Sequence, residues 1–199
     1  MSLAAAVAHD DHHDTSTGLN SWKVGFWTFF GSECLFFATL ISTYMVYKWR
    51  SVVGHFPEEI LDIPLTSIST FILLMSSLSM VLALDAVQRG NKKLSLIWLG
   101  GVIVLGAGFL GFQVYEFNHF VHEGLTIGTN VFGSSFFVLT GFHGAHVAGG
   151  VIWLTTLWIM AARNKLPSKD ALKVEIAGLY WHFVDIVWIV IFTLVYLIQ

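Results

Sequence analysis

Five long apolar stretches separated by short polar connections dominate this sequence. They run at about 22–47, 64–87, 94–117, 131–162 and 176–198. A helix needs roughly 20 mostly apolar residues to cross the hydrocarbon core of a bilayer, and each stretch is long enough. Charged residues make up only 12% of the chain, about half the share in a soluble domain, so too few remain to coat a water-facing surface. The sequence therefore predicts an all-α membrane protein in which residues 22–199 form one bundle of five transmembrane helices.

The basic residues predict the orientation of this bundle. With five spans, the N-terminus and the second and fourth connections share one side, and that side holds eight of the ten Lys and Arg residues. Because the cytoplasmic side of membrane proteins is enriched in Lys and Arg, we expect the N-terminus in the cytoplasm and the C-terminus outside. Residues 1–21 are polar and include the run from His9 to Asp14. We expect a flexible tail there, with a weak divalent-metal site as the alternative.

Composition and motifs argue against several functional classes. A net charge of −3 without a basic stripe disfavours nucleic-acid binding. The single cysteine excludes an internal disulfide and any Cys-based zinc or iron–sulfur site made by this chain alone. The run from His119 to Glu123 has its glutamate after both histidines, so it fails to match an inverted zinc-protease motif. The sequence offers no self-sufficient active site.

Five ionisable residues lie at similar depth within the predicted spans: Glu33, His143, His146, His182 and Asp185. An ionisable group in hydrocarbon is costly and normally faces a partner group, a cavity or another subunit. We interpret this intramembrane polar layer as a structural clasp between helices that also organises lipid, with a proton relay and an ion site as alternatives. By depth, we expect Glu33 to hydrogen-bond His143 rather than His146.

Two further functions stay open on the residues alone. Histidines on facing helices hold haem in membrane cytochromes, so haem ligation is one of them. The small-residue seam Gly141, Ala145 and Gly149 opposes it, because small residues four apart bring helix backbones close together and leave no slot for a porphyrin. The other is a stand-alone proton or ion carrier that uses Glu33 and Asp185.

Five ordered motifs are distributed along the predicted spans. They are Gly31–Phe37, Gly111–Phe117, Phe132–Ser134, Thr140–Val147 and Tyr180–Trp188. Together they resemble subunit III of the haem–copper respiratory oxidases, and the resemblance covers about residues 22–199. It implies that Glu33 is the family's membrane carboxylate. It also implies that His143 and His146 belong to its Gly-Phe-His-x-x-His element, and His182 and Asp185 to its Trp-His-Phe-Val-Asp element.

The resemblance implies a non-catalytic subunit of a proton-pumping terminal oxidase in a bacterial plasma membrane. In that family the haems and copper belong to subunits I and II, so this chain would bind no metal or cofactor itself. It would flank subunit I, assemble with subunit II and a small subunit IV, bind phospholipids and support proton uptake. Five spans fit a bacterial form that lacks the first helix pair of mitochondrial-type subunits. The run from Glu116 to Glu123 favours cytochrome c as the electron donor of the complex, with quinol as the alternative.

Overall fold

Five long helices make up the described part of the chain. A computed structural model describes residues 21–48, 50, 62–167 and 171–198. The helices are α1 (Ser21–Tyr47), α3 (Ile63–Gln88), α4 (Lys92–His122), α5 (Val131–Ala162) and α6 (Ala171–Phe192), which continues as a π-helical turn, η2 (Thr193–Leu197). Each is long and apolar enough to cross a membrane, which confirms the predicted all-α fold with five spans. Of the predicted tail, 1–21, all but Ser21 lies outside the described residues.

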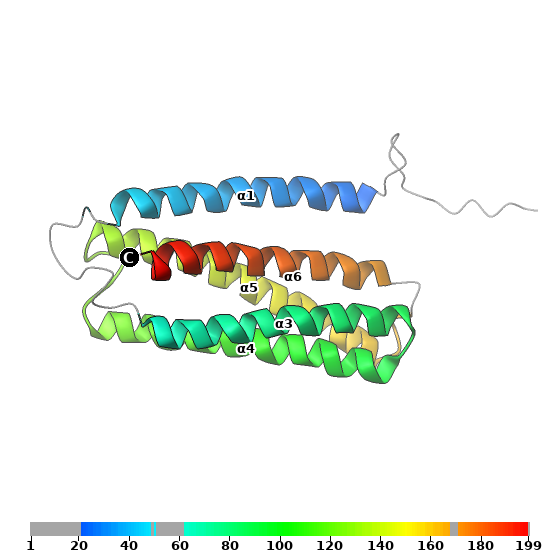
Figure 1. Cartoon of the computed structure of the whole chain (residues 1–199). Coiled ribbons are helices and arrows are strands. Elements are labelled where there is room, and N and C mark those ends of the chain that lie inside the picture. Colours follow the sequence, from blue (N-terminus) through cyan, green and yellow to red (C-terminus); the bar gives the residue numbers. More distant parts are fainter. Residues whose placement is uncertain (1–20, 49, 51–61, 168–170, 199) are drawn as a thin grey trace, which may run out of the picture.

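The helices run in alternating directions, so the bundle has two opposite ends (Figure 1). One end, the α3–α4 end, also holds the start of α1 and the connection from α5 to α6. The other, the α4–α5 end, holds the end of α1, the start of α3 and the C-terminal residues. Helix α1 packs against α5 and α6, whereas α3 packs against α4 and α6, and α5 joins α4 to α6. The side of the membrane that each end faces remains a prediction.

Helix boundaries follow local capping signals. Asp62, Asn91 and Asn130 precede α3, α4 and α5, and each side chain accepts a hydrogen bond from the backbone N–H three residues later, at 3.0, 3.2 and 2.6 Å. Helix α4 continues five residues beyond the expected end, because no helix-breaking residue occurs before Gly124, whose φ is +87°. The run from Glu116 to Glu123 therefore lies in the last turns of the helix and at its C-cap.

Two glycines make room for a buried tryptophan at the centre of the bundle. The ring of Trp181 on α6 is fully buried and passes between Gly106 of α4 and Gly150 of α5. A Cβ at either glycine would lie within 3 Å of ring carbons of Trp181, closer than real contacts allow. The indole N–H donates to the hydroxyl of Ser76 on α3, 2.9 Å away. This one side chain therefore ties α6 to three neighbouring helices.

The predicted seam of Gly141, Ala145 and Gly149 does not form the closest helix contact. A Cβ at Gly141 would meet nothing within 4 Å, and one at Gly149 would make an ordinary contact of 3.8 Å. The close approach on α5 occurs at Gly150 and at Gly144, which faces the side chain of Gln113 on α4. Four-residue spacing correctly indicated close packing of this helix but selected the wrong face.

Candidate functional site

The five residues of the predicted polar layer fall into three separate places. Glu33 of α1 meets His146 of α5. His182 and Asp185 of α6 are joined through a serine of α3. His143 lies among aromatic rings. Within the described residues, no hydrogen bond connects one place with another, so the layer forms separate contacts between helices rather than one chain of hydrogen bonds.

The contact between Glu33 and His146 joins α1 to α5. The carboxylate Oε2 lies 3.2 Å from Nε2 of the imidazole, an ion-pair contact that lacks the alignment of a hydrogen bond. The other ring nitrogen, Nδ1, lies 2.7 Å from the backbone oxygen of Phe142. A carbonyl oxygen only accepts, so Nδ1 carries a proton. If neither Nε2 of His146 nor the carboxylate of Glu33 carried a proton, the lone pairs of these two groups would face each other and repel. A favourable contact therefore requires a proton on one of the two groups.

Glu33 does lie against a histidine of α5, but the contact is an ion pair with His146 rather than the expected hydrogen bond to His143. The two histidines are three residues apart, which separates them by almost a full turn and turns them about 60° from one another. His146 points toward α1, whereas His143 points into the core between α4 and α6. Depth along the helix alone could not distinguish these two directions.

His143 packs as an aromatic side chain. Its ring is fully buried and stacks on Trp188 of α6, with 4.8 Å between ring centroids and 25° between the planes. Phe109 of α4 meets it edge-on at 5.8 Å. Neither ring nitrogen has a hydrogen-bond partner among the described residues. His143 thus belongs to the aromatic core between α4, α5 and α6 and contacts neither carboxylate of the layer through a hydrogen bond.

His182 and Asp185 meet α3 at a residue that sequence reasoning did not single out. The Ser77 hydroxyl donates to Oδ2 of Asp185 and lies 2.8 Å from Nδ1 of His182. Two more bonds follow the same helix pair, as the indole N–H of Trp188 donates to Thr70 and that of Trp181 donates to Ser76, each at 2.9 Å. The α3–α6 contact is therefore fastened by a series of side-chain hydrogen bonds.

A second buried carboxylate, Glu116, lies nearer the α4–α5 end. Its Oε1 accepts hydrogen bonds from the hydroxyl of Thr66 on α3 at 2.9 Å and from that of Tyr196 in η2 at 3.1 Å. All three side chains are buried. The hydroxyl of Tyr44 on α1 is also buried and has no hydrogen-bond partner in the described part of the chain. This cluster joins α4 to both α3 and the end of α6, and it was missed because Glu116 was not counted in the predicted polar layer.

The spacing of residues along α4 indicates that Glu116 is buried. Phe109, Gln113, Glu116 and Phe120 follow one another at intervals of four, three and four residues, and all four are buried. This spacing places side chains on one face of a helix. The helical phase of the third span, rather than its bounds, would have placed the Glu116 carboxylate in the core.

An apolar cleft opens beside α1. One cavity of about 510 Å³ lies between α1, α5 and α6 and is lined by Phe26, Trp153, Thr156, Leu157, Met160, Leu172, Lys173 and Ile176. A second of about 360 Å³ shares Phe26 and Trp153 and reaches Tyr180. The Tyr180 hydroxyl donates to the backbone oxygen of His146 at 2.9 Å, so the cleft adjoins the Glu33–His146 contact. These volumes fall within the range of pockets that hold small ligands.

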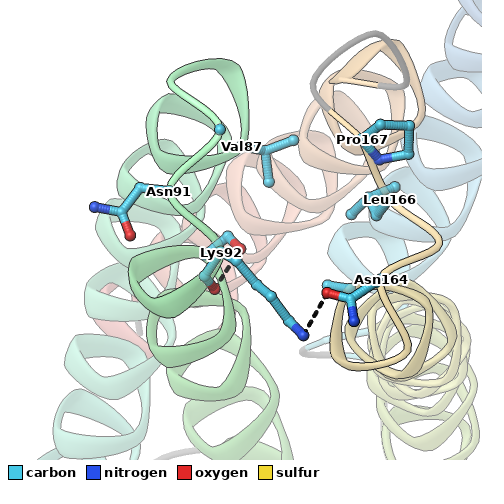
Figure 2. Close-up of a pocket in the computed structure, with 9 residues that line it drawn as sticks. Val87, Asn91, Lys92, Asn164, Leu166 and Pro167 are labelled. Carbon is cyan, nitrogen blue, oxygen red and sulfur yellow. Dashed lines mark hydrogen bonds between the residues drawn. The ribbon is translucent and has the colours of Figure 1, made fainter.

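A smaller pocket of about 220 Å³ lies at the α3–α4 end, between the α3–α4 turn and the residues that follow α5 (Figure 2). Lys92 crosses this gap, and its ammonium donates to the backbone oxygen of Ala162 at 3.0 Å and to the side chain of Asn164 at 2.6 Å. A cation at the C-terminal end of α5 also favours the helix dipole. Lys92 therefore holds two connections together at one end of the bundle.

Metal binding finds no support in the described residues, which contain no group of three or more His, Cys, Asp or Glu side chains placed to hold an ion. The predicted alternative in the run from His9 to Asp14 lies outside the described residues. The remaining arrangement is a membrane bundle fastened by buried polar contacts, with an apolar cleft along α1.

Comparison with known proteins identifies the family. Residues 4–199 match the profile of the family described as cytochrome c oxidase subunit III. The chain is 43% identical over 190 residues to cytochrome c oxidase subunit 3 of Bacillus sp. strain PS3, covering 96% of this chain and 91% of that protein. It is 44% identical over 174 residues to quinol oxidase subunit 3 of Bacillus subtilis strain 168, covering 87% and 85%.

A more distant relative extends the same result. Cytochrome bo(3) ubiquinol oxidase subunit 3 of Pseudomonas aeruginosa is 37% identical over 194 residues, covering 98% of this chain and 92% of that protein. The resemblance in the motifs around Glu33, His146 and Asp185 is thus part of a similarity along nearly the whole sequence. This chain belongs to the cytochrome c oxidase subunit III family of haem–copper respiratory oxidases.

Proposed function

We propose that this chain is a non-catalytic subunit of a proton-pumping terminal oxidase, held in the plasma membrane of a bacterium. It stabilises subunit I, assembles with the other oxidase subunits, binds phospholipid and supports proton uptake by keeping its helices and lipids in place. The haems and copper belong to partner subunits. The Glu33–His146 contact beside an apolar cleft is the observation that carries this proposal.

The arrangement of the buried polar groups supports a structural role. Glu33 meets His146 between α1 and α5, Ser77 joins α3 to α6, and Glu116 joins α4 to α3 and η2. Each contact joins side chains of different helices, and hydrocarbon offers buried polar groups no other partner. A proton relay made of these side chains alone would instead require them to follow one another within hydrogen-bond reach, and no such link joins them in the described residues.

The cleft along α1 supports phospholipid binding. Its walls are mostly aromatic and aliphatic, as an acyl chain requires, and Lys173 lines it toward the α3–α4 end. A lysine near the membrane surface attracts anionic lipid headgroups. The cleft adjoins Tyr180, which contacts the backbone of the residue that pairs with Glu33. Loss of the Glu33–His146 contact should therefore change how α1 and lipid pack together.

The electron donor is a property of the complex rather than of this chain. Relatives named for cytochrome c oxidase and for quinol oxidase match at 43% and 44% identity. We retain cytochrome c as the predicted donor, with quinol as the alternative. The haem types and the presence of a copper-binding subunit II in the purified complex would distinguish the two.

Glu33→Gln in the intact oxidase tests the structural role. The glutamine amide keeps the shape of the side chain but cannot ionise, so it cannot take up and release a proton as a carboxyl group does. We expect protons pumped per electron to stay near the wild-type ratio, while bound phospholipid falls and the enzyme inactivates sooner during turnover. Cys34→Ser is the matched control, because this neighbour is exposed on the same helix and should leave lipid content and pumping unchanged.

Two measurements on the same preparation decide the result, namely the pumping ratio in vesicles and the phospholipid content of the purified complex. A Glu33→Gln enzyme with normal lipid content and normal assembly that no longer pumps would contradict the proposal. In that case the carboxyl group itself would be conducting protons.

A further inference from the structure

At the α3–α6 contact, one ring nitrogen of His182 has no hydrogen-bond partner among the described residues. The Ser77 hydroxyl has a single proton, which it donates to Asp185, so it accepts from Nδ1–H of His182. In a neutral imidazole with its proton on Nδ1, the other nitrogen, Nε2, is a hydrogen-bond acceptor. Among the described residues, the hydrogen bond of the His182 side chain is made at Nδ1 and none is made at Nε2, and the side chain is only half-buried.

This nitrogen lies deep in the membrane. His182 is the twelfth of the 27 residues from Ala171 to Leu197, so it is close to the middle of its span. The exposed residues around it on the two helices are aliphatic and include Leu74 and Val81 of α3 and Ile186 and Ile189 of α6. An acceptor nitrogen is therefore presented within an apolar surface at mid-membrane depth.

Lipid alone would leave this acceptor unsatisfied. Acyl chains carry no hydrogen-bond donor, and headgroups lie at the membrane surface. The exposed hydroxyls of α1 behave differently, since Thr28, Ser32, Thr39 and Thr43 each donate to a backbone oxygen of their own helix. Those side chains are satisfied while they face lipid. His182 has no such internal partner for Nε2, which favours a protein neighbour at this position.

We propose that the exposed surface of α3 and α6 around His182 is a docking surface for a transmembrane helix of another oxidase subunit, and that this helix donates a hydrogen bond to Nε2. The inference rests on the proposed function, because it requires an oxidase partner. Ser77 and Asp185 hold the imidazole in the tautomer that accepts. A hydroxyl, amide or indole at mid-span is the chemistry that the partner helix would present.

A photo-crosslinking residue at Ile186 tests the surface in the intact purified oxidase. Ile186 is 59% exposed and lies one turn beyond His182 on the same side of α6. The matched control is Val104 of α4, which is 70% exposed on a different helix. We expect the probe at Ile186 to form an adduct with the membrane helix of another oxidase subunit, identified by mass spectrometry, and the probe at Val104 to label lipid.

Exclusive labelling of lipid or quinone from Ile186 in an assembled oxidase would overturn the docking surface. Failure of this chain to co-purify with any oxidase subunit would instead overturn the proposed function, so the two failures can be told apart. A subunit adduct from Val104 and none from Ile186 would place the interface on α4 and refute the inference.

Variants of His182 test the hydrogen bond itself. His182→Leu should raise the rate at which detergent washing strips this chain from the complex by about three- to fifteenfold, as the loss of one hydrogen bond between membrane helices implies. His182→Gln, which can still accept, should change the rate less. Ser77→Ala keeps the imidazole but releases the bond that fixes its tautomer, so it should raise the stripping rate less than His182→Leu does. If His182→Gln is stripped from the complex as fast as His182→Leu, a hydrogen-bond acceptor at this position does not hold the subunit in place and the proposal fails.

Discussion

Alanine at Gly150 should make the bundle about 1–3 kcal/mol less stable than alanine at Gly141, although both lie in α5. A Cβ at Gly150 would lie 2.8 Å from two ring carbons of Trp181, whereas one at Gly141 would meet nothing within 4 Å. Trp181 cannot move aside easily, because it is fully buried, donates to Ser76 and is backed by Gly106. Extra methyl groups in a packed core cost about 1–3 kcal/mol.

The comparison removes the effect of helix propensity. Both variants gain about 0.5–1 kcal/mol when alanine replaces glycine in a helix, so the difference between them reports the contact with Trp181. Titration of the purified chain with a denaturing detergent, followed by circular dichroism, gives the two free energies of unfolding. Gly141→Ala should be neutral or stabilising. Equal values for the two variants, or a more stable Gly150→Ala, would refute the packing described around Trp181.

Three other substitutions address the buried bonds and the α3–α4 end. Ser77→Ala removes the hydroxyl between His182 and Asp185, so the free energy of unfolding should fall by about 0.6–2 kcal/mol. An unchanged free energy of unfolding would mean that the hydrogen bonds of Ser77 contribute nothing to stability. Thr66→Val keeps the side-chain shape but leaves Tyr196 as the hydrogen-bond donor to Glu116 among the described residues, so the same assay should show a loss of about 1–3 kcal/mol. A loss no larger than at an exposed threonine such as Thr39 would count against the cluster. Lys92→Met removes the hydrogen bonds to Ala162 and Asn164. The free energy of unfolding should change by about 1 kcal/mol or less, while hydrogen exchange of the backbone amides in 163–167 becomes faster. Exchange that matches the wild type would show that Lys92 does not hold the two connections together.

The number and approximate bounds of the spans were predictable, because hydropathy and length alone decide whether a helix can cross a membrane. The expected range 131–162 agrees with α5. The ends of the other helices were harder to predict from the sequence, because connections near the membrane surface can remain helical. Helix α4 continues to His122, five residues beyond the expected end, and Glu116 near that end is buried.

The partners of the polar residues could be predicted only in part. Depth along each span correctly grouped Glu33 with the histidines of the fourth span, but rotation about the helix axis decides that His146 rather than His143 faces α1. The α3–α6 bonds were missed for a related reason. Serine side chains such as Ser77 add little polarity to a span and become informative only once the facing helix is known.

Gentle extraction of this chain with an affinity tag, followed by mass spectrometry and an absorption spectrum, tests its central assignment most directly. We expect recovery of an oxidase complex with one copy of this chain for each haem- and copper-bearing subunit I, and haem absorption that disappears when the chain is separated from its partners. A chain that purifies alone and carries haem, or that transports protons alone in lipid vesicles, would contradict the assignment.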